Sequence, residues 1–195
     1  MLDVTSHVLA SIFARDMVLK MGYTTSMDMV KLTKVSVHTT SKYVAADPKY
    51  VSVHALALQL MTGQTPYVTR AKQSIATWKL KKGMVLGCAV TLRRAPMTQC
   101  LTQWLMVLLP RFKDRVSLPV PSTHHTVHVS MTQPLFHPSA EHLVELFEPI
   151  DGCVMDVHTN ATSHIETLLL CTAIGLPVHS VDTRVDAQPP THAPS

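Results

Sequence analysis

Nine positively charged side chains, which can neutralise the phosphates of a nucleic acid, fall between residues 61 and 113 of this 195-residue chain. They are Arg70, Lys72, Lys79, Lys81, Lys82, Arg93, Arg94, Arg111 and Lys113. No Asp or Glu occurs between Asp47 and Asp114. Because an ordinary solvated surface mixes both signs of charge, this interval indicates an anionic partner that supplies the missing sign. The alternative interpretation is a solvated basic face without a partner.

The charge is distributed unevenly along the whole chain. Residues 1–115 hold 16 Lys and Arg against 5 Asp and Glu, a balance of +11. Residues 116–195 hold 1 against 8, a balance of −7, and the two halves sum to the net charge of +4. This asymmetry predicts one surface for an anionic partner and another surface for other contacts.

The composition is that of a folded chain, with 46% hydrophobic and 15% charged residues. The longest apolar run, near residues 104–109, is much shorter than a membrane span. The four cysteines form no CxxC pair and lie in apolar patterns. We therefore expect buried free thiols rather than disulfides or zinc ligands.

Apolar periodicities predict helices that alternate with strands. Side chains alternate, as in half-buried strands, near residues 34–38, 74–81, 85–93, 127–131 and 153–159. For residues 74–81 the same alternation also fits an extended hairpin arm. Helical spacing or helix signals occur at residues 3–21, 51–61, 96–108, 140–147 and 163–174. Gly63 is expected to end the second of these helices and Pro96 to lie in the first turn of the third, and Thr162 or Ser163 with Glu166 resembles a capping box for the last. The pattern predicts an α+β fold with a mostly antiparallel sheet, helices packed on one face and a basic extended loop between strands. We expect residues 1–177 to form a single domain and residues 178–195 an irregular or disordered tail.

Signals for catalysis are weak. Gly83 and Gly87 lack the Gly-Lys-Ser/Thr that a phosphate-binding loop requires, and no HExxH motif occurs. His124, His125 and His128 could gather near a metal, but as loop and strand-face groups they could also stack on RNA bases. We expect no catalytic residue, no metal site and no cofactor. A small enzyme that depends on a Cys–His pair remains the alternative.

Several segments resemble the large ribosomal subunit protein five family, which anchors 5S rRNA. The resemblance rests on TGQTPYVTRAKQSIA at residues 62–76, KLKKGM at 79–84, GCAVTLR at 87–93, LPRFKD at 109–114 and FEPIDG at 147–152. It extends from about Tyr23 to Pro177, and its last segment is closer to mitochondrial members than to bacterial ones. Two loops depart from the family pattern: residues 38–41 lack the usual glycines, and residues 119–125 replace a loop rich in Arg and Gly.

The resemblance implies roles for individual residues. The positions that would contact rRNA are Lys34, His38, Gln64, Thr91, Arg93, Arg94 and Arg111. The loop from Arg70 to Gly83 matches an arm that reaches P-site tRNA, and its RNA-facing residues would be Arg70, Lys72, Ser74, Lys79, Lys81 and Lys82. Trp78 lies between these lysines and could stack on a nucleotide, although we favour a role in anchoring the loop to the core.

The resemblance also implies partners and a location. The protein would bind 5S-type rRNA and large-subunit rRNA in the central protuberance, and would contact P-site tRNA during translation. Neighbouring ribosomal proteins and the head of the small subunit would be its protein partners, and no homo-oligomer is expected. We expect the mitochondrial matrix, with a chloroplast or bacterial ribosome as the alternative. A free-standing mitochondrial RNA- or tRNA-binding factor on the same fold is the second functional hypothesis.

Overall fold

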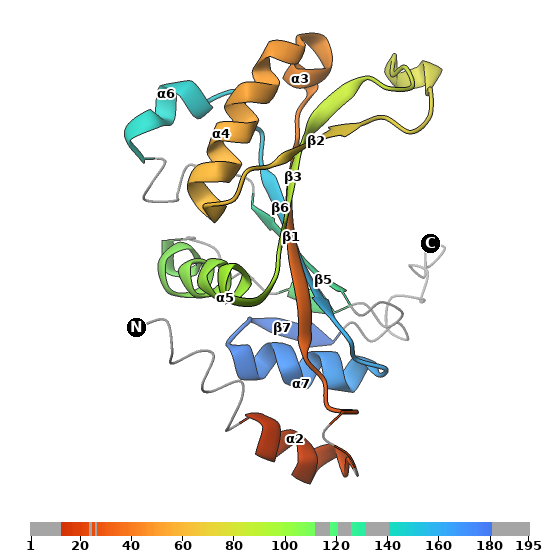
Figure 1. Cartoon of the computed structure of the whole chain (residues 1–195), viewed down its shortest axis with the longest axis vertical. Coiled ribbons are helices and arrows are strands. Elements are labelled where there is room, and N and C mark those ends of the chain that lie inside the picture. Colours follow the sequence, from red (N-terminus) through yellow and green to blue (C-terminus); the bar gives the residue numbers. More distant parts are fainter. Residues whose placement is uncertain are drawn as a thin grey trace, which may run out of the picture.

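The fold is built on a five-stranded sheet with the strand order β2-β3-β1-β6-β5, in which every neighbouring pair is antiparallel (Figure 1). The computed structural model describes residues 13–23, 25, 27–111, 118–120, 126–131 and 141–180. The five strands are β1 (Leu32–Thr40), β2 (Tyr67–Arg70), β3 (Val85–Leu92), β5 (Thr126–Met131) and β6 (Cys153–Thr159). Together with the helices they give the α+β class that the sequence predicts.

The alternation of side chains along β1 separates the two faces of the sheet. Val35 and Val37 are fully buried, whereas Ser36 and His38, which alternate with them, are partly exposed. In the register of the sheet, Val37 lies opposite Val90 of β3 and Met155 of β6. Because successive side chains point to opposite faces, this pairing collects the apolar residues of neighbouring strands on one face and the polar residues on the other.

Two helices cover part of the apolar face (Figure 1). Helix α4 (Val51–Thr62) ends at Gly63, whose φ of 71° gives the left-handed turn that the sequence predicts. Helix α5 (Arg94–Gln103) has Pro96 in its first turn and continues through one wider turn (Trp104–Leu108) and a 3₁₀ turn (Leu109–Arg111). Both helices bury apolar residues in the main core with β1, β3, β5 and β6.

The remaining elements complete the core at its two ends. They are α2 (Phe13–Met21), α3 (Lys42–Ala46), α6 (Val144–Phe147), α7 (His164–Ile174) and the parallel pair β4 (Leu118–Val120) and β7 (Val178–Ser180), with 3₁₀ turns at Pro48–Tyr50, Ala76–Trp78 and Glu141–Leu143. Glu166 accepts hydrogen bonds from the backbone N–H groups of Thr162 and Ser163, which confirms the predicted cap of α7. The Tyr23 hydroxyl donates to the same carboxylate at 2.6 Å and joins the segment after α2 to α7.

Two expectations differ from the structure. Residues 74–81 do not form a strand, because a 3₁₀ turn (Ala76–Trp78) and the left-handed Lys79 (φ 55°) interrupt the alternation; only the isolated bridge between Ile75 and Leu80 remains. The strand that pairs with β3 at this edge of the sheet is instead β2. Residues 178–180 are the strand β7 rather than an irregular tail, because they pair with β4. The expected helix at 3–21 is described from Phe13 onward, and its residues 3–12, like residues 181–195 of the expected tail, lie outside the described residues.

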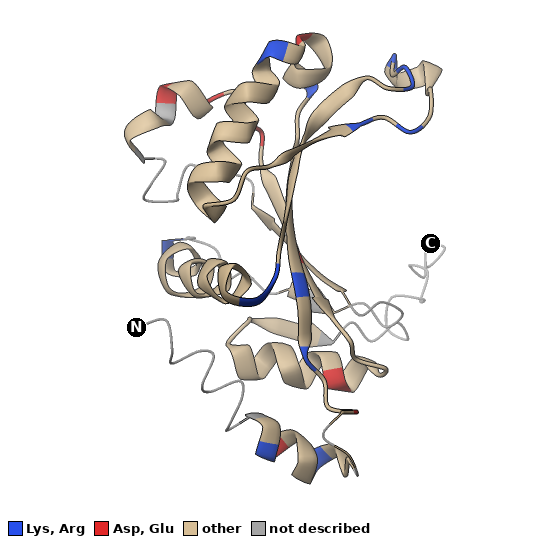
Figure 2. Ribbon diagram, viewed as in Figure 1, with Lys and Arg blue, Asp and Glu red and all other residues tan. Residues whose placement is uncertain are grey.

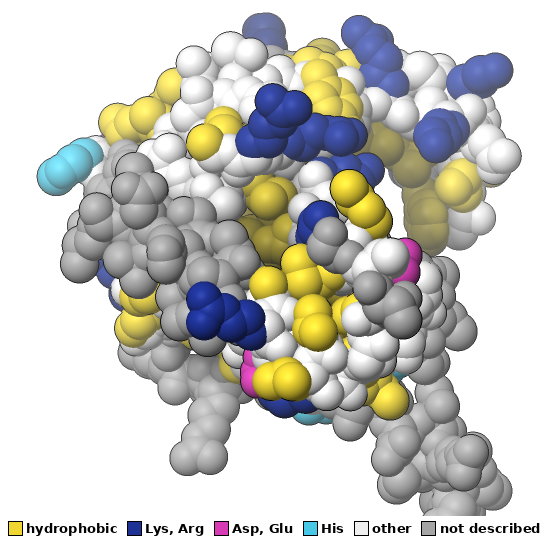
Figure 3. Space-filling model, turned by 60° about the horizontal axis from the view of Figure 1, so that its bottom comes forward, with side chains coloured by type: hydrophobic (Ala, Val, Ile, Leu, Met, Phe, Trp, Pro, Cys, Tyr) yellow, Lys and Arg dark blue, Asp and Glu magenta, His cyan; other side chains and the backbone are white. Residues whose placement is uncertain are grey.

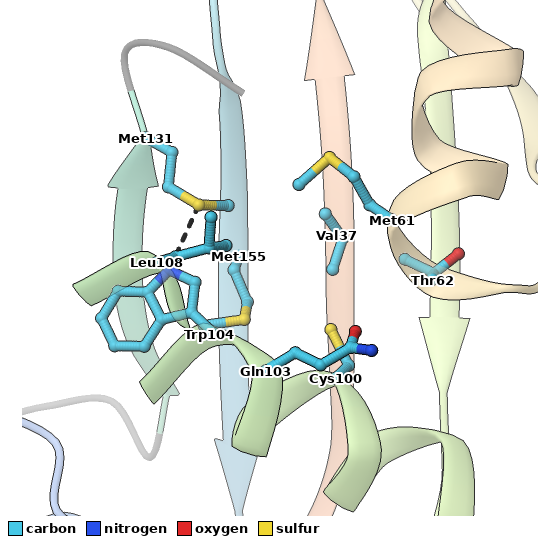
Figure 4. Close-up of a pocket in the computed structure, with 9 residues that line it drawn as sticks. All are labelled: Val37, Met61, Thr62, Cys100, Gln103, Trp104, Leu108, Met131 and Met155. Carbon is cyan, nitrogen blue, oxygen red and sulfur yellow. Dashed lines mark hydrogen bonds between the residues drawn. The ribbon is translucent and has the colours of Figure 1, made fainter. Parts of the chain in front are cut away.

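The interior between α4, α5 and the sheet is closely packed (Figure 4). Trp104 is 2% exposed, and its indole N–H donates to the sulfur of Met131 at 3.2 Å. The cavity beside this pair measures only about 10 Å³ and has mostly apolar walls. A space of this size holds one water molecule at most, so it is a packing defect and not a ligand site.

Gly87 lies in β3 where no larger side chain fits. A Cβ atom at this position would meet the carbonyl oxygen of Thr39 at 2.0 Å. We predict that Gly87→Ala lowers the free energy of unfolding by about 3 kcal/mol, because the backbone of β1 cannot yield without breaking its pairing. Urea unfolding would measure this loss. Thr40→Ala changes the exposed residue paired with Gly87 and should stay near wild type; equal midpoints for the two variants would contradict the close approach.

His54 of α4 is fully buried against Thr39 of β1. Its Nδ1 lies 3.2 Å from the Thr39 Oγ, which itself donates to the Gly152 carbonyl at 2.8 Å. Since the hydroxyl proton of Thr39 is used in that bond, Nδ1–H must be the donor, and Nε2 has no partner among the described residues. Burial lowers the pKa of His54, and the more distant Asp151 opposes this only in part.

The buried imidazole gives a pH-dependent stability with a definite sign. The unfolded chain takes up a proton below a pH of about 6.5, whereas the folded state resists protonation, so stability is lost as the pH falls below that value. We predict that His54→Leu shows a smaller loss of stability between about pH 7.5 and pH 5 than wild type. His158 has a pKa shifted in the same direction, so part of the loss will remain. His142→Gln, at an exposed site, is the control. Identical pH profiles for His54→Leu and wild type would exclude this role of His54.

Candidate nucleic-acid interface

Strands β2 and β3 continue past the edge of the sheet as an arm whose loop, residues 71–84, projects from the body (Figure 1). Backbone hydrogen bonds close this loop: Gly83 N–H donates to the Ala71 carbonyl at 2.9 Å, and Ala71 N–H donates to Met84 at 2.9 Å. Lysines and arginines are visible along the arm in Figure 2, and no acidic residue is. Its four lysines are all exposed: Lys72, Lys79, Lys81 and Lys82. Within the described part of the chain, none of them has a carboxylate partner.

Three further residues of the arm, Arg70, Ser74 and Trp78, differ from the lysines in their surroundings. The Ser74 hydroxyl accepts a hydrogen bond from the Lys82 N–H at 3.0 Å, and Arg70 donates to the Gly83 carbonyl at 3.3 Å. Both side chains therefore fix the shape of the loop. Trp78 is 70% exposed, so the expectation that it anchors the loop to the core is wrong. The 3₁₀ turn holds Trp78 in a projecting loop that has no interior of its own.

The polar face of the sheet brings together some of the residues that the sequence singles out. Lys34 lies opposite His158, and Ser36 lies between Thr91 of β3 and Asp156 of β6. Lys34, His38 and Thr91 therefore share one face, which we call the open face. Gln64, which follows α4, donates from its amide to the backbone carbonyl of Thr91 at 3.4 Å. These four residues lie around the pairing of β1 with β3.

The arginines are more widely spread. Arg93 immediately precedes α5 without a capping hydrogen bond from its side chain, and Arg94 is the first residue of the helix, with a φ of 55°; both are exposed. They follow directly on β3 and so lie next to Thr91. Arg111 is at the far end of the same helical stretch, roughly 25 Å away at 1.5 Å per residue. The structure therefore does not place Arg111 with the other predicted rRNA contacts.

Two residues of the open face, Asp156 and His158, were not identified as site residues from the sequence; His128, which was considered there as a metal ligand or an RNA-stacking group, lies beside Asp156. Nδ1 of His128 lies 2.7 Å from one oxygen of Asp156, and Nδ1 of His38 lies 3.4 Å from the other. Nε2 of His158 lies 2.8 Å from the Ser36 hydroxyl, and Nδ1 lies 3.2 Å from that of Thr126. Burial, with a smaller effect of Lys34, lowers the pKa of His158. The alternation of β6 places Asp156 on the polar face, but only the pairing of the strands reveals the cluster.

No constellation for catalysis occurs among the described residues. Burial raises the pKa of the Cys100 thiol to about 11 and those of Cys153 and Cys171 to about 12, which opposes a nucleophilic thiolate. A cleft of about 260 Å³ beside α4 and α5 has Gln64, Gln99 and Gln103 in its wall, but no histidine or carboxylate. In the same residues, no three His, Cys, Asp or Glu side chains are arranged to hold a metal ion. None of the described helices has the length and apolar character to cross a membrane.

Figure 3 shows how the charged side chains are distributed over one side of the molecular surface. Lysine and arginine side chains gather toward one side of the view, whereas acidic side chains are few and scattered. Apolar side chains also reach the surface here. Among the described residues, the most exposed apolar side chains are Leu19 and Met27, near α2, with Ile165 of α7 also exposed. The molecule therefore presents a cationic surface and separate apolar contacts.

Comparison with known proteins finds similarity to ribosomal proteins. Residues 26–81 match the family model described as Ribosomal protein L5. The chain is 30% identical to the large ribosomal subunit protein uL5m of Reclinomonas americana over 166 residues, which cover 84% of this chain and 91% of that protein. It is 32% identical to uL5 of Syntrophus aciditrophicus over 82% of this chain and 89% of that one. It is 30% identical to uL5m of Prototheca wickerhamii over 76% and 68%.

These matches define the class of protein as a structural ribosomal protein and not an enzyme. The chain belongs to the ribosomal protein L5 family, as the sequence motifs predict. Bacterial and mitochondrial members of the family are similar to it at comparable identity.

Proposed function

We propose that this protein binds a 5S-type rRNA in the central protuberance of the large ribosomal subunit and reaches P-site tRNA with its basic arm. The observation that supports this best is the arm itself. It projects from the body, it contains no acidic residue, and its exposed lysines have no carboxylate partner within the described residues. Such a segment gains its counter-charge from the phosphates of an RNA backbone.

The open face would bind the rRNA. Lys34 and Arg93 offer positive charges to phosphates, and Gln64, Thr91 and His38 offer polar groups to sugar and phosphate oxygens. Arg94 is exposed beside Arg93 and would add a second phosphate contact. Arg111, at the other end of the helical stretch, would bind a different rRNA segment. In the arm, Lys72, Lys79, Lys81 and Lys82 would face tRNA, while Arg70 and Ser74 hold the loop in shape.

Protein partners would use other surfaces. Residues 116–195 have the opposite charge balance from the arm, and the exposed Leu19 and Met27 offer apolar contacts. We propose that these regions face neighbouring ribosomal proteins and the small-subunit head, and that residues 1–177 act as one domain. The relatives named uL5m in Reclinomonas and Prototheca support a mitochondrial ribosome. The alternative is a free-standing RNA- or tRNA-binding factor, which would not sediment with large subunits.

Reversing the charge of the arm should weaken binding to RNA. We predict that Lys79→Glu, Lys81→Glu and Lys82→Glu together lower the affinity for tRNA and 5S rRNA transcripts. The plot of log affinity against log salt should also flatten, by roughly 0.7–0.9 for each phosphate that the variant no longer neutralises. Filter binding over a series of salt concentrations measures both effects.

A matched triple variant separates the arm from net charge. Lys20→Glu, Lys31→Glu and Lys49→Glu change the total charge by the same amount at sites outside the arm. This control should keep most of the salt dependence. If the slope flattens equally in both triple variants, the binding depends on overall charge, and the assignment of the arm is wrong.

The exposed Trp78 gives a second test of the arm. Stacking of an indole on a nucleotide contributes about 1–3 kcal/mol, so we predict that Trp78→Ala weakens RNA binding by roughly 5- to 150-fold. Because Trp78 is 70% exposed, the free energy of unfolding should hardly change. Trp78→Phe keeps an aromatic face and should retain most of the affinity. A loss of stability without a loss of affinity would instead indicate a structural role for the indole.

A further inference from the structure

One carboxylate lies in the middle of the open face. Asp156 is the only acidic residue in the five strands of the sheet, all of which are described. Its side chain is 15% exposed. A carboxylate on a surface that binds RNA repels phosphates and is costly to desolvate, so its surroundings must compensate for it.

The compensation comes from histidines on both neighbouring strands. His38 of β1 lies on one side of Asp156, with Nδ1 3.4 Å from Oδ2. His128 of β5 lies on the other side, with Nδ1 2.7 Å from Oδ1. Each imidazole thus approaches a different carboxylate oxygen, and the three side chains form a bridge across three strands. The side chains of His38 and His128 are 38% and 58% exposed, so both rings also reach the surface.

His128 Nδ1 is hydrogen-bonded to Asp156, whereas His38 lies within ion-pair distance of it, and a ring that uses Nδ1 in this way is limited in what it can offer to a ligand. In a neutral imidazole that donates Nδ1–H to Asp156, Nε2 has a lone pair and no proton. It cannot donate to a phosphate oxygen in that state. Only the protonated ring can donate to Asp156 and to a phosphate at the same time. Binding of a phosphate at Nε2 is therefore coupled to uptake of a proton.

The other groups on this face do not change the argument. Lys34 on β1 lies opposite His158, two residues along β6 from Asp156, and its positive charge balances that carboxylate when the imidazoles are neutral. Ser36, Thr91, Thr126 and Ser130 are uncharged. His158 lies between the hydroxyls of Ser36 and Thr126, and burial lowers its pKa, which favours its neutral form. Protonation of His38 and His128 would change the charge of the cluster from 0 to +2.

We propose that His38 and His128, oriented by Asp156, form a phosphate-binding site on the open face whose positive charge is supplied by proton uptake. This proposal rests on the proposed binding of rRNA by the open face and adds Asp156, as a positioning residue, and His128 to it. The RNA affinity of the face rises as the pH falls through the range in which histidine titrates. The arm, with its lysines, binds without this dependence.

The test measures the affinity of the full chain for a 5S rRNA transcript at about pH 6 and about pH 8 at fixed salt. Wild type is expected to bind about fivefold more tightly or better at the lower pH, the equivalent of two exposed ion pairs. The slope of log affinity against log salt should steepen by up to about 1.4–1.8 for two added phosphate contacts. The variant His38→Gln with His128→Gln should lack this gain in affinity between the higher and the lower pH.

Two further variants make the result specific. His142→Gln removes an exposed histidine outside the sheet and should keep the wild-type pH dependence. Asp156→Asn removes the repulsive charge and should bind RNA more tightly than wild type at the higher pH. Thermal unfolding of every variant shows that it is folded. If the double variant does not fold, His128→Gln alone, at the more exposed site, should show about half of the gain.

The outcomes separate this proposal from the proposed function. If the double variant keeps the pH dependence of wild type, the phosphate site is disproved, while binding of rRNA by the protein stands. The same holds if Asp156→Asn binds more weakly than wild type at the higher pH while it remains folded. If wild type binds neither the rRNA nor the tRNA transcript at any pH, the proposed function itself is wrong.

Discussion

The structure depends on the separation of two faces along one central strand. Val35 and Val37 of β1 point into a core that β3, β5, β6, α4 and α5 complete, and the close approach of Gly87 to the backbone of β1 leaves no room for a shift in register. Helices α4 and α5 cover only one side of the sheet (Figure 1). The side chains of β1 that alternate with these valines, such as Ser36, therefore remain at the surface. The burial of apolar groups on one face thus creates the polar face on the other.

The same sheet also supports the arm. Strand β3 runs through the sheet and continues, with β2, into the loop at residues 71–84. Hydrogen bonds of the backbone and of Ser74 fix this loop, so its lysines are held apart from the body without burial of their charges. A rigid hairpin with exposed lysines loses little conformational entropy when it binds a polyanion. The arm and the open face are therefore two parts of one rigid support.

Much of the fold follows from the sequence, and the exceptions have physical causes. Gly63, Pro96 and the pair of Ser163 with Glu166 are local signals, and each marks a helix end as predicted. The alternation of residues 74–81 is misleading, since a period of two predicts a strand only where one face can be buried, and the loop has no partner layer. The expectation for Trp78 fails for the same reason. The cluster around Asp156 depends on the register of three strands that are far apart in the sequence, which periodicity alone does not determine.

The two cationic surfaces differ in the kind of charge they use. The lysines of the arm have no carboxylate partner within the described residues, which keeps their charges available to phosphates. On the open face, Lys34 and Asp156 carry opposite charges, and His38 and His128 lie against the Asp156 carboxylate. Under the proposed function, a face with few permanent charges and many hydroxyls and imidazoles would favour an RNA whose shape fits the sheet, whereas the lysines of the arm would contact phosphates of any sequence. One continuous sheet would then combine selective contact at its centre with general attraction at its edge.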